Sequence, residues 1–66
     1  MIQLHYDTPV TALRVLAEMP GLVRELAART GIPVPRIAEC VWWLEAEGLA
    51  RCDLSSMVWS AEEETR

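Results

Sequence analysis

The chain has 66 residues, of which 52% are hydrophobic, and a formal net charge of −4. This length allows one small domain with a marginal core, so tight packing or a second copy must contribute to its stability. The acidic balance disfavours indiscriminate binding to nucleic acid, because such binding depends on neutralising phosphates with cations.

Residues 1–6 alternate roughly between apolar and polar side chains, which predicts a short strand. Ile2, Leu4 and Tyr6 would share one side of it. Because a single strand needs a partner, it would pair with a later hairpin or with a second copy of the chain. We interpret His5, on the opposite side, as structural or solvent-exposed, since no Ser, Cys or Asp constellation surrounds it.

The Asp-Thr-Pro sequence at 7–9 predicts the start of a first helix. Asp7 or Thr8 would supply a capping oxygen, and proline suits the first helical position. The helix should run to about Met19, before a turn at Pro20-Gly21. Its apolar side chains recur at helical spacing and are predicted to face the core: Val10, Leu13, Leu16 and Ala17.

A second helix is predicted from about Leu22 to Arg29, and Thr30-Gly31 should end it. Arg24 and Glu25 would face outward. The side chains predicted to face inward are Leu22, Val23, Leu26 and Ala27. Short helices joined by a tight turn with a glycine, the last of them longer, are typical of a helix-turn-helix.

The longest helix is predicted over residues 33–47. Pro33 and Pro35 suit a first turn, and Gly48 can adopt the left-handed conformation that ends a helix. Its inward face is defined by apolar residues at i, i+4 and i+7, together with a neighbouring cysteine: Ile37, Val41, Leu44 and Cys40.

Two adjacent tryptophans occupy different sides of this helix, because successive residues turn by about 100°. Trp43 falls on the flank of the inward face, where we expect it to cover the edge of the core. Trp42 falls outside, near Ala38 and Glu39. Since large exposed aromatic side chains mark contact surfaces, we predict that Trp42 belongs to a binding or dimer surface.

Residues 49–53 and 57–60 are predicted strands joined by a turn at 54–56, with Trp59 packed inside. Residues 61–66 would form an acidic C-terminal tail, either frayed or starting a brief helix. The sequence therefore predicts one domain over 1–60, mainly α with a small β-hairpin, as in a three-helix winged helix-turn-helix with an extra N-terminal strand.

The stretch 25–50, ELAARTGIPVPRIAECVWWLEAEGLA, resembles the winged helix-turn-helix domains of bacterial transcriptional repressors of the MarR and IclR kind. Most of the matching positions are structural. They are Glu25, Leu26, Ala27, Thr30, Gly31, Ile32, Ile37, Cys40, Val41, Leu44, Glu45, Gly48 and Leu49.

This resemblance implies that helix 33–47 lies in the major groove of double-stranded DNA and reads bases with its start and outer face. Arg36 would contact a phosphate or guanine, although it can instead pair with Glu39 one turn on. The expected DNA-contacting positions on this helix are Val34, Pro35, Arg36, Ala38, Glu39 and Trp42. The arginines expected to hold the DNA backbone are Arg24, Arg29 and Arg51.

Two functions follow from these observations. The first is a small sequence-specific DNA-binding regulator of bacterial or phage type, acting as a homodimer on a two-fold site. The second is an acidic winged-helix protein–protein interaction module, or a homodimerising adaptor, that uses Trp42 and its neighbours. The lack of lysine and the absence of a cation at 54–56 favour the second function.

We expect no enzyme, since the sequence has no nucleophile–base pair, phosphate-binding glycine loop or metal motif. Glu45 and Glu47 do not share a helical face, and neither a cofactor nor a small-molecule substrate is evident. Without a leader or a membrane-spanning run, a cytoplasmic location is expected, with Cys40 and Cys52 as packed thiols.

Overall fold

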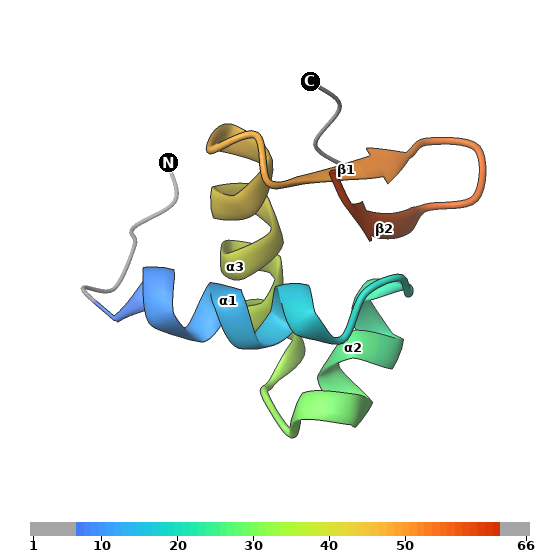
Figure 1. Cartoon of the computed structure of the whole chain (residues 1–66). Coiled ribbons are helices and arrows are strands. Elements are labelled where there is room, and N and C mark those ends of the chain that lie inside the picture. Colours follow the sequence, from blue (N-terminus) through green and yellow to red (C-terminus); the bar gives the residue numbers. More distant parts are fainter. Residues whose placement is uncertain (1–6, 63–66) are drawn as a thin grey trace.

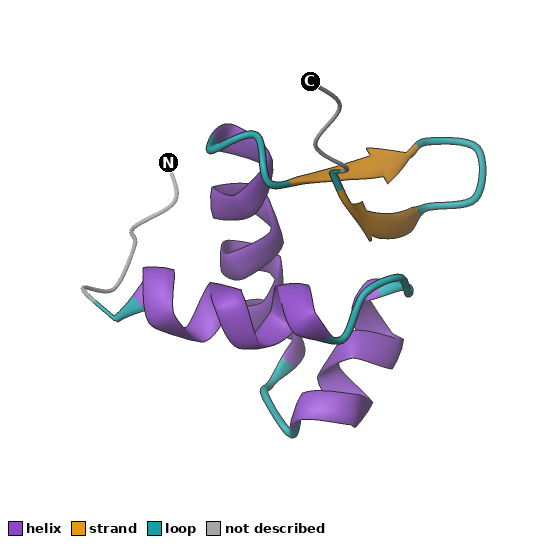
Figure 2. Ribbon diagram, viewed as in Figure 1, coloured by secondary structure: helices purple, strands orange, loops and turns teal. Residues whose placement is uncertain are grey.

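The computed structural model describes residues 7–62. It contains three helices, α1 (Thr8–Ala17), α2 (Val23–Thr30) and α3 (Val34–Ala46), followed by an antiparallel hairpin of β1 (Ala50–Asp53) and β2 (Val58–Ala61). In Figure 1, α1 crosses α3, and α2 lies beside the lower part of the pair. Figure 2 shows the hairpin projecting from the C-terminal end of α3.

The predicted fold class is confirmed, because the domain is mainly helical with a small hairpin, in the element order of a winged helix-turn-helix. The predicted strand at 1–6 lies outside the described residues, as do His5 and residues 63–66 of the predicted tail. No helix among residues 7–62 is both long and apolar enough to cross a membrane.

The predicted inward stripe of α1 is wrong at three of its four positions. The side chains that α1 buries are those of Thr8, Ala12 and Val15, whereas Val10 is 69% exposed and Leu13 is 54% exposed. Both faces of α1 are apolar, so periodicity alone does not select one of them. The buried face carries the smaller side chains, which allow the backbone of α1 to approach α3 closely. Of the predicted stripe, Leu16 packs against the core and Ala17 is exposed.

The predicted capping bond of α1 is also wrong. Asp7 occupies the cap position, but its side chain makes no capping hydrogen bond. The carboxylate pairs instead with Arg36 of α3. At the start of α2 a carboxylate does reach the backbone, because Glu25 accepts a 2.8 Å hydrogen bond from the Leu22 N–H.

The inward face of α3 is as predicted. Ile37, Val41, Leu44 and Cys40 are all buried. The glycines that follow α2 and α3 adopt left-handed backbone conformations, with φ of 76° at Gly31 and 77° at Gly48. The core lies between the three helices and the base of the hairpin. Its buried apolar residues are Ala12, Val15, Leu26, Ile32, Ile37, Cys40, Val41, Leu44 and Ala50.

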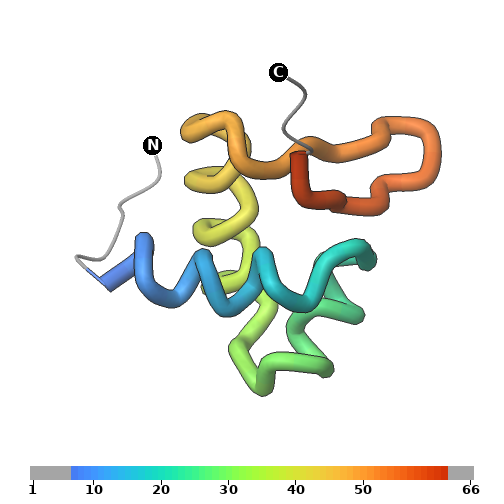
Figure 3. The backbone as a smooth tube through the Cα atoms, in the orientation of Figure 1, coloured from blue at the N-terminus to red at the C-terminus, as the bar shows by residue number. Residues whose placement is uncertain are grey.

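The hairpin packs against the core and is hydrogen-bonded to the turn after α1. Its two strands pair so that Cys52 lies opposite Trp59. Trp59 is half-buried and packs against the core, and Trp43 on the flank of α3 does the same. Two backbone hydrogen bonds join Trp59 to Gly21, at 3.0 and 2.8 Å. Figure 3 shows this turn after α1 close to the second strand of the hairpin.

Candidate functional site

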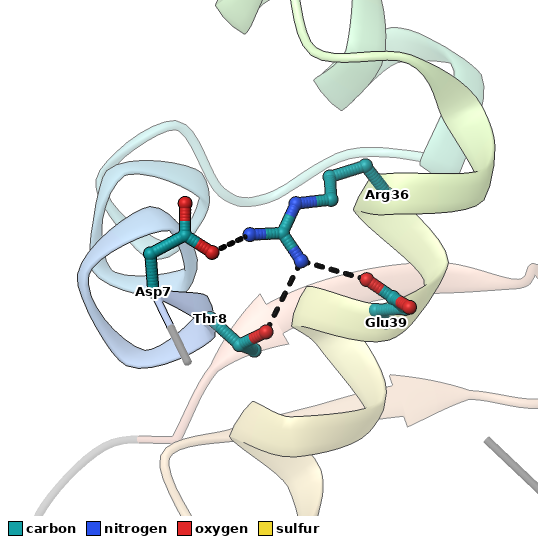
Figure 4. A network of polar contacts seen from close by, with 4 residues as sticks. All are labelled: Asp7, Thr8, Arg36 and Glu39. Carbon is teal, nitrogen blue, oxygen red and sulfur yellow. Dashed lines mark hydrogen bonds and ion pairs between the residues drawn. The ribbon is translucent and has the colours of Figure 1, made fainter. Parts of the chain in front are cut away.

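Arg36, in the first turn of α3, is held by contacts with the start of α1 (Figure 4). Its guanidinium donates to the Asp7 carboxylate, to the hydroxyl of Thr8 at 3.1 Å and to the Glu39 carboxylate at 2.7 Å. Pairing with Glu39 was one of the two interpretations from sequence, whereas the contacts with Asp7 and Thr8 were not expected.

This network fixes α1 on α3. Thr8 is fully buried, and Arg36 satisfies its hydroxyl oxygen. The hydrogen bond that Arg36 donates to Glu39 raises the pKa of Arg36 most, Asp7 raises it further, and desolvation opposes them. The guanidinium therefore stays charged and points toward α1. Arg36 joins α3 to the start of α1, and Glu39 pairs with Arg36 within α3, which leaves fewer polar groups on the outer face of α3.

The outer face of α3 is mainly apolar. Val34, Ala38 and Trp42 follow one another at intervals of four residues and are all exposed; we call them the α3 ridge. Trp42 is 49% exposed, so its predicted outward position is confirmed. Glu45, also exposed, lies one turn beyond Trp42. Arg36 is the only cation within Val34–Ala46, so the ridge presents no cation of its own to a partner.

The arginines predicted to hold DNA are dispersed. Arg29 donates through Nη1 to the carbonyl oxygens of Glu18 and Pro20, at 2.8 and 2.7 Å, and thereby ties α2 to the turn after α1. Arg51 of the hairpin lies 3.7 Å from Glu62. Arg24 is exposed, and its side chain makes no hydrogen bond or ion pair with any residue of 7–62.

Arg24 stands at an apolar groove of about 320 Å³ between the starts of α2 and α3 and the hairpin. The groove is lined by Leu22, Val23, Arg24, Val34, Met57 and Trp59. Val34 and Met57 are large apolar residues with exposed fractions of 47% and 56%. Sequence reasoning did not find this groove, because its walls come from three separate segments of the chain. Met57 gave no local signal either, because the sequence predicts it as the first residue of a strand, whereas its φ of 63° places it at the end of the turn.

A second depression, of about 540 Å³, lies along the hairpin and is lined in part by Arg51, Asp53 and Ser55. Asp53 accepts hydrogen bonds from the Ser55 backbone N–H, at 3.0 Å, and from its hydroxyl, at 2.9 Å. These bonds lower the pKa of Asp53, with the hydroxyl contributing most. The Asp53 carboxylate thus stabilises the turn that begins at this residue.

Within residues 7–62, no group of three His, Cys, Asp or Glu side chains could hold a metal ion. Cys40 and Cys52 form no disulfide; the first is buried and the second half-buried. No protein-family model, curated protein or solved structure matches the chain. The resemblance to repressors of the MarR and IclR kind therefore remains a prediction.

Proposed function

We propose that this chain is a winged-helix protein–protein interaction module that binds its partner through the α3 ridge, with Trp42 as the anchor. The observation that carries the proposal is the half-exposed Trp42 on the outer face of α3, a helix whose only cation, Arg36, is bonded to Asp7 and Glu39. Tryptophan is among the residues most enriched at the energetic centres of protein interfaces.

The charge around the ridge favours a protein over DNA. Glu45 and Glu47 are exposed near the C-terminal end of α3, and the chain as a whole carries a net charge of −4. A helix in the major groove approaches two phosphate strands closely, and carboxylates at its edge would be repelled. A protein surface with an apolar pocket and a nearby cation would instead complement Trp42 and Glu45.

Sequence-specific binding of double-stranded DNA is the second candidate. It is favoured by the helix–hairpin order and by the position of Arg24, exposed and unpaired among the described residues beside the start of α3. In this alternative α3 enters the major groove and Arg24 contacts a phosphate.

Affinity capture with the immobilised chain, followed by binding measurements on the purified captured protein, tests the first candidate. Trp42→Ala should weaken that binding by roughly thirtyfold, the effect of losing an anchor worth about 2 kcal/mol. Leu54→Ala, which removes an exposed leucine at the hairpin tip, is the matched control and should bind like the wild type. Equal affinity for wild type and Trp42→Ala would contradict the proposed surface.

Fluorescence polarisation against a pool of random duplexes at low salt tests the second candidate. We expect no binding. Saturable binding that falls steeply with salt, and that Arg24→Ala weakens, would replace the protein-binding proposal with the DNA-binding one.

A further inference from the structure

We infer that the partner of the α3 ridge is a second copy of this chain, with each Trp42 inserted into the groove beside Arg24 of the other copy. This inference rests on the proposed function, because it names the partner for the same surface. It requires that the ridge and the groove be complementary in spacing, shape and charge.

The spacing along α3 is self-complementary. Val34 and Trp42 each lie four residues from Ala38 along the exposed ridge. If two copies of α3 cross in antiparallel fashion at Ala38, Trp42 of one copy comes opposite Val34 of the other, which lines the groove. A two-fold axis at Ala38 makes both contacts equivalent. Alanine at the crossing point lets the two helices approach closely, as ridge-into-groove packing of i±4 rows requires.

The groove has the chemistry and size to receive an indole. Five of its six lining residues are apolar, and its volume of about 320 Å³ falls at the lower end of the range for small-ligand sites, about 300–1,000 Å³. Insertion would cover Trp42, Val34 and Met57, three of the large apolar side chains that the single chain exposes. Burial of such surface is the main source of affinity in protein association.

The charges also match. Glu45 follows Trp42 by one turn, and Arg24 stands at the groove; the side chain of neither makes a hydrogen bond or ion pair with any residue of 7–62. In the antiparallel arrangement Glu45 accompanies Trp42 toward Arg24 of the other copy, so two ion pairs form per dimer. The Arg24 guanidinium can also stack on the inserted indole, which is a favourable cation–π contact.

Sedimentation equilibrium of four samples tests this inference: wild type, Arg24→Glu, Glu45→Arg, and an equimolar mixture of the two variants. Wild type should be a dimer and each variant alone a monomer, because each variant places like charges at both contacts. The mixture should form dimers again, since in the mixed dimer both contacts pair opposite charges. A contact within one chain would give no such recovery.

Two further variants locate the interface, and circular dichroism establishes that each is folded. Trp42→Ala should be monomeric, whereas Leu13→Ala, on the outer face of α1, should remain dimeric. Monomeric wild type, or a dimer that Leu13→Ala abolishes and Trp42→Ala preserves, would overturn the inference. If wild type is monomeric yet captures another protein in a Trp42-dependent way, this inference fails while the proposed function stands.

Discussion

Arg36 shows how much the role of one side chain depends on a distant part of the chain. The i,i+3 spacing to Glu39 was visible in the sequence, and that ion pair forms at 2.7 Å. The pairing with Asp7, 29 positions away, was not visible because it depends on how α1 crosses α3. The local ion pair with Glu39 was therefore predictable, whereas the pairing with Asp7, which turns the guanidinium away from the outer face, was not.

Arg36→Met should lower the urea concentration at the midpoint of unfolding, because the buried Thr8 hydroxyl and the Glu39 carboxylate lose their donor. Arg24→Met is the matched control, since Arg24 has no such partner among residues 7–62, and its midpoint should stay close to that of the wild type. Both comparisons belong in the Trp42→Ala background, where self-association does not contribute. Equal midpoints for the two variants would contradict a structural role for Arg36.

The two thiols should differ in reactivity. Burial has the largest effect on the pKa of the Cys40 thiol and raises it, whereas Cys52 is only half-buried. With a thiol-specific chromogenic reagent at neutral pH, the wild type should show one fast-reacting thiol, which should be absent in Cys52→Ser. Cys40 should react only at the rate of unfolding.

Stability should also depend on pH through Cys40. Because the folded chain holds the Cys40 proton more tightly, the stability that this proton contributes is complete below the unfolded-state pKa and is lost as pH rises through the folded-state pKa. Cys40→Ala should lack this alkaline loss.

At the scale of single elements, helix boundaries followed from local chemistry, whereas the orientation of α1 did not. Prolines near helix starts and glycines after helix ends act within one turn, so the sequence located these positions to within a few residues. The two faces of α1 are both apolar, and the choice between them depends on which face fits α3. The small side chains of Thr8 and Ala12 decide that fit.

Leu13→Ala and Leu26→Ala test this orientation directly. Leu13 is exposed and Leu26 is fully buried. The first substitution should change the free energy of unfolding by no more than about 0.5 kcal/mol, and the second should lower it by about 2–5 kcal/mol. Urea denaturation measures both. A large loss from Leu13→Ala would mean that α1 presents its other face to the core.

The hairpin turn carries backbone strain at Met57, whose φ of 63° is unfavourable for a side chain with a Cβ atom. Met57→Gly should raise the free energy of unfolding by about 1 kcal/mol, measured in the Trp42→Ala background. In the otherwise wild-type chain the same substitution should weaken the dimer, because the methionine lines the groove. Unchanged dimerisation would remove Met57 from the interface.

At the scale of the whole molecule, the sequence predicted the three helices and the hairpin but not the groove. Helices and turns leave periodic and local signals, while the groove joins the start of α2, the start of α3 and the end of the hairpin turn. Trp42 could be placed outside because Ile37, Val41 and Leu44, at i, i+4 and i+7, define the inward face of α3. The groove, which shares Val34 with the α3 ridge, could be found only after three segments were placed in space.

The midpoint temperature of unfolding should rise with protein concentration, because dimerisation stabilises only the folded state. Trp42→Ala should show a midpoint that does not depend on concentration. Differential scanning calorimetry across a hundredfold range of concentration measures both. A wild-type midpoint that stays constant over this range would contradict self-association.

The two backbone hydrogen bonds between Gly21 and Trp59 also limit how far the groove can change shape. They attach one wall of the groove to the corner between the first two helices, so the hairpin cannot swing outward without breaking the domain's own pairing. A side chain that entered the groove would therefore meet walls already held in place, because the entropy of ordering them was lost earlier, when the chain folded. The groove and the rest of the domain should unfold in one cooperative transition.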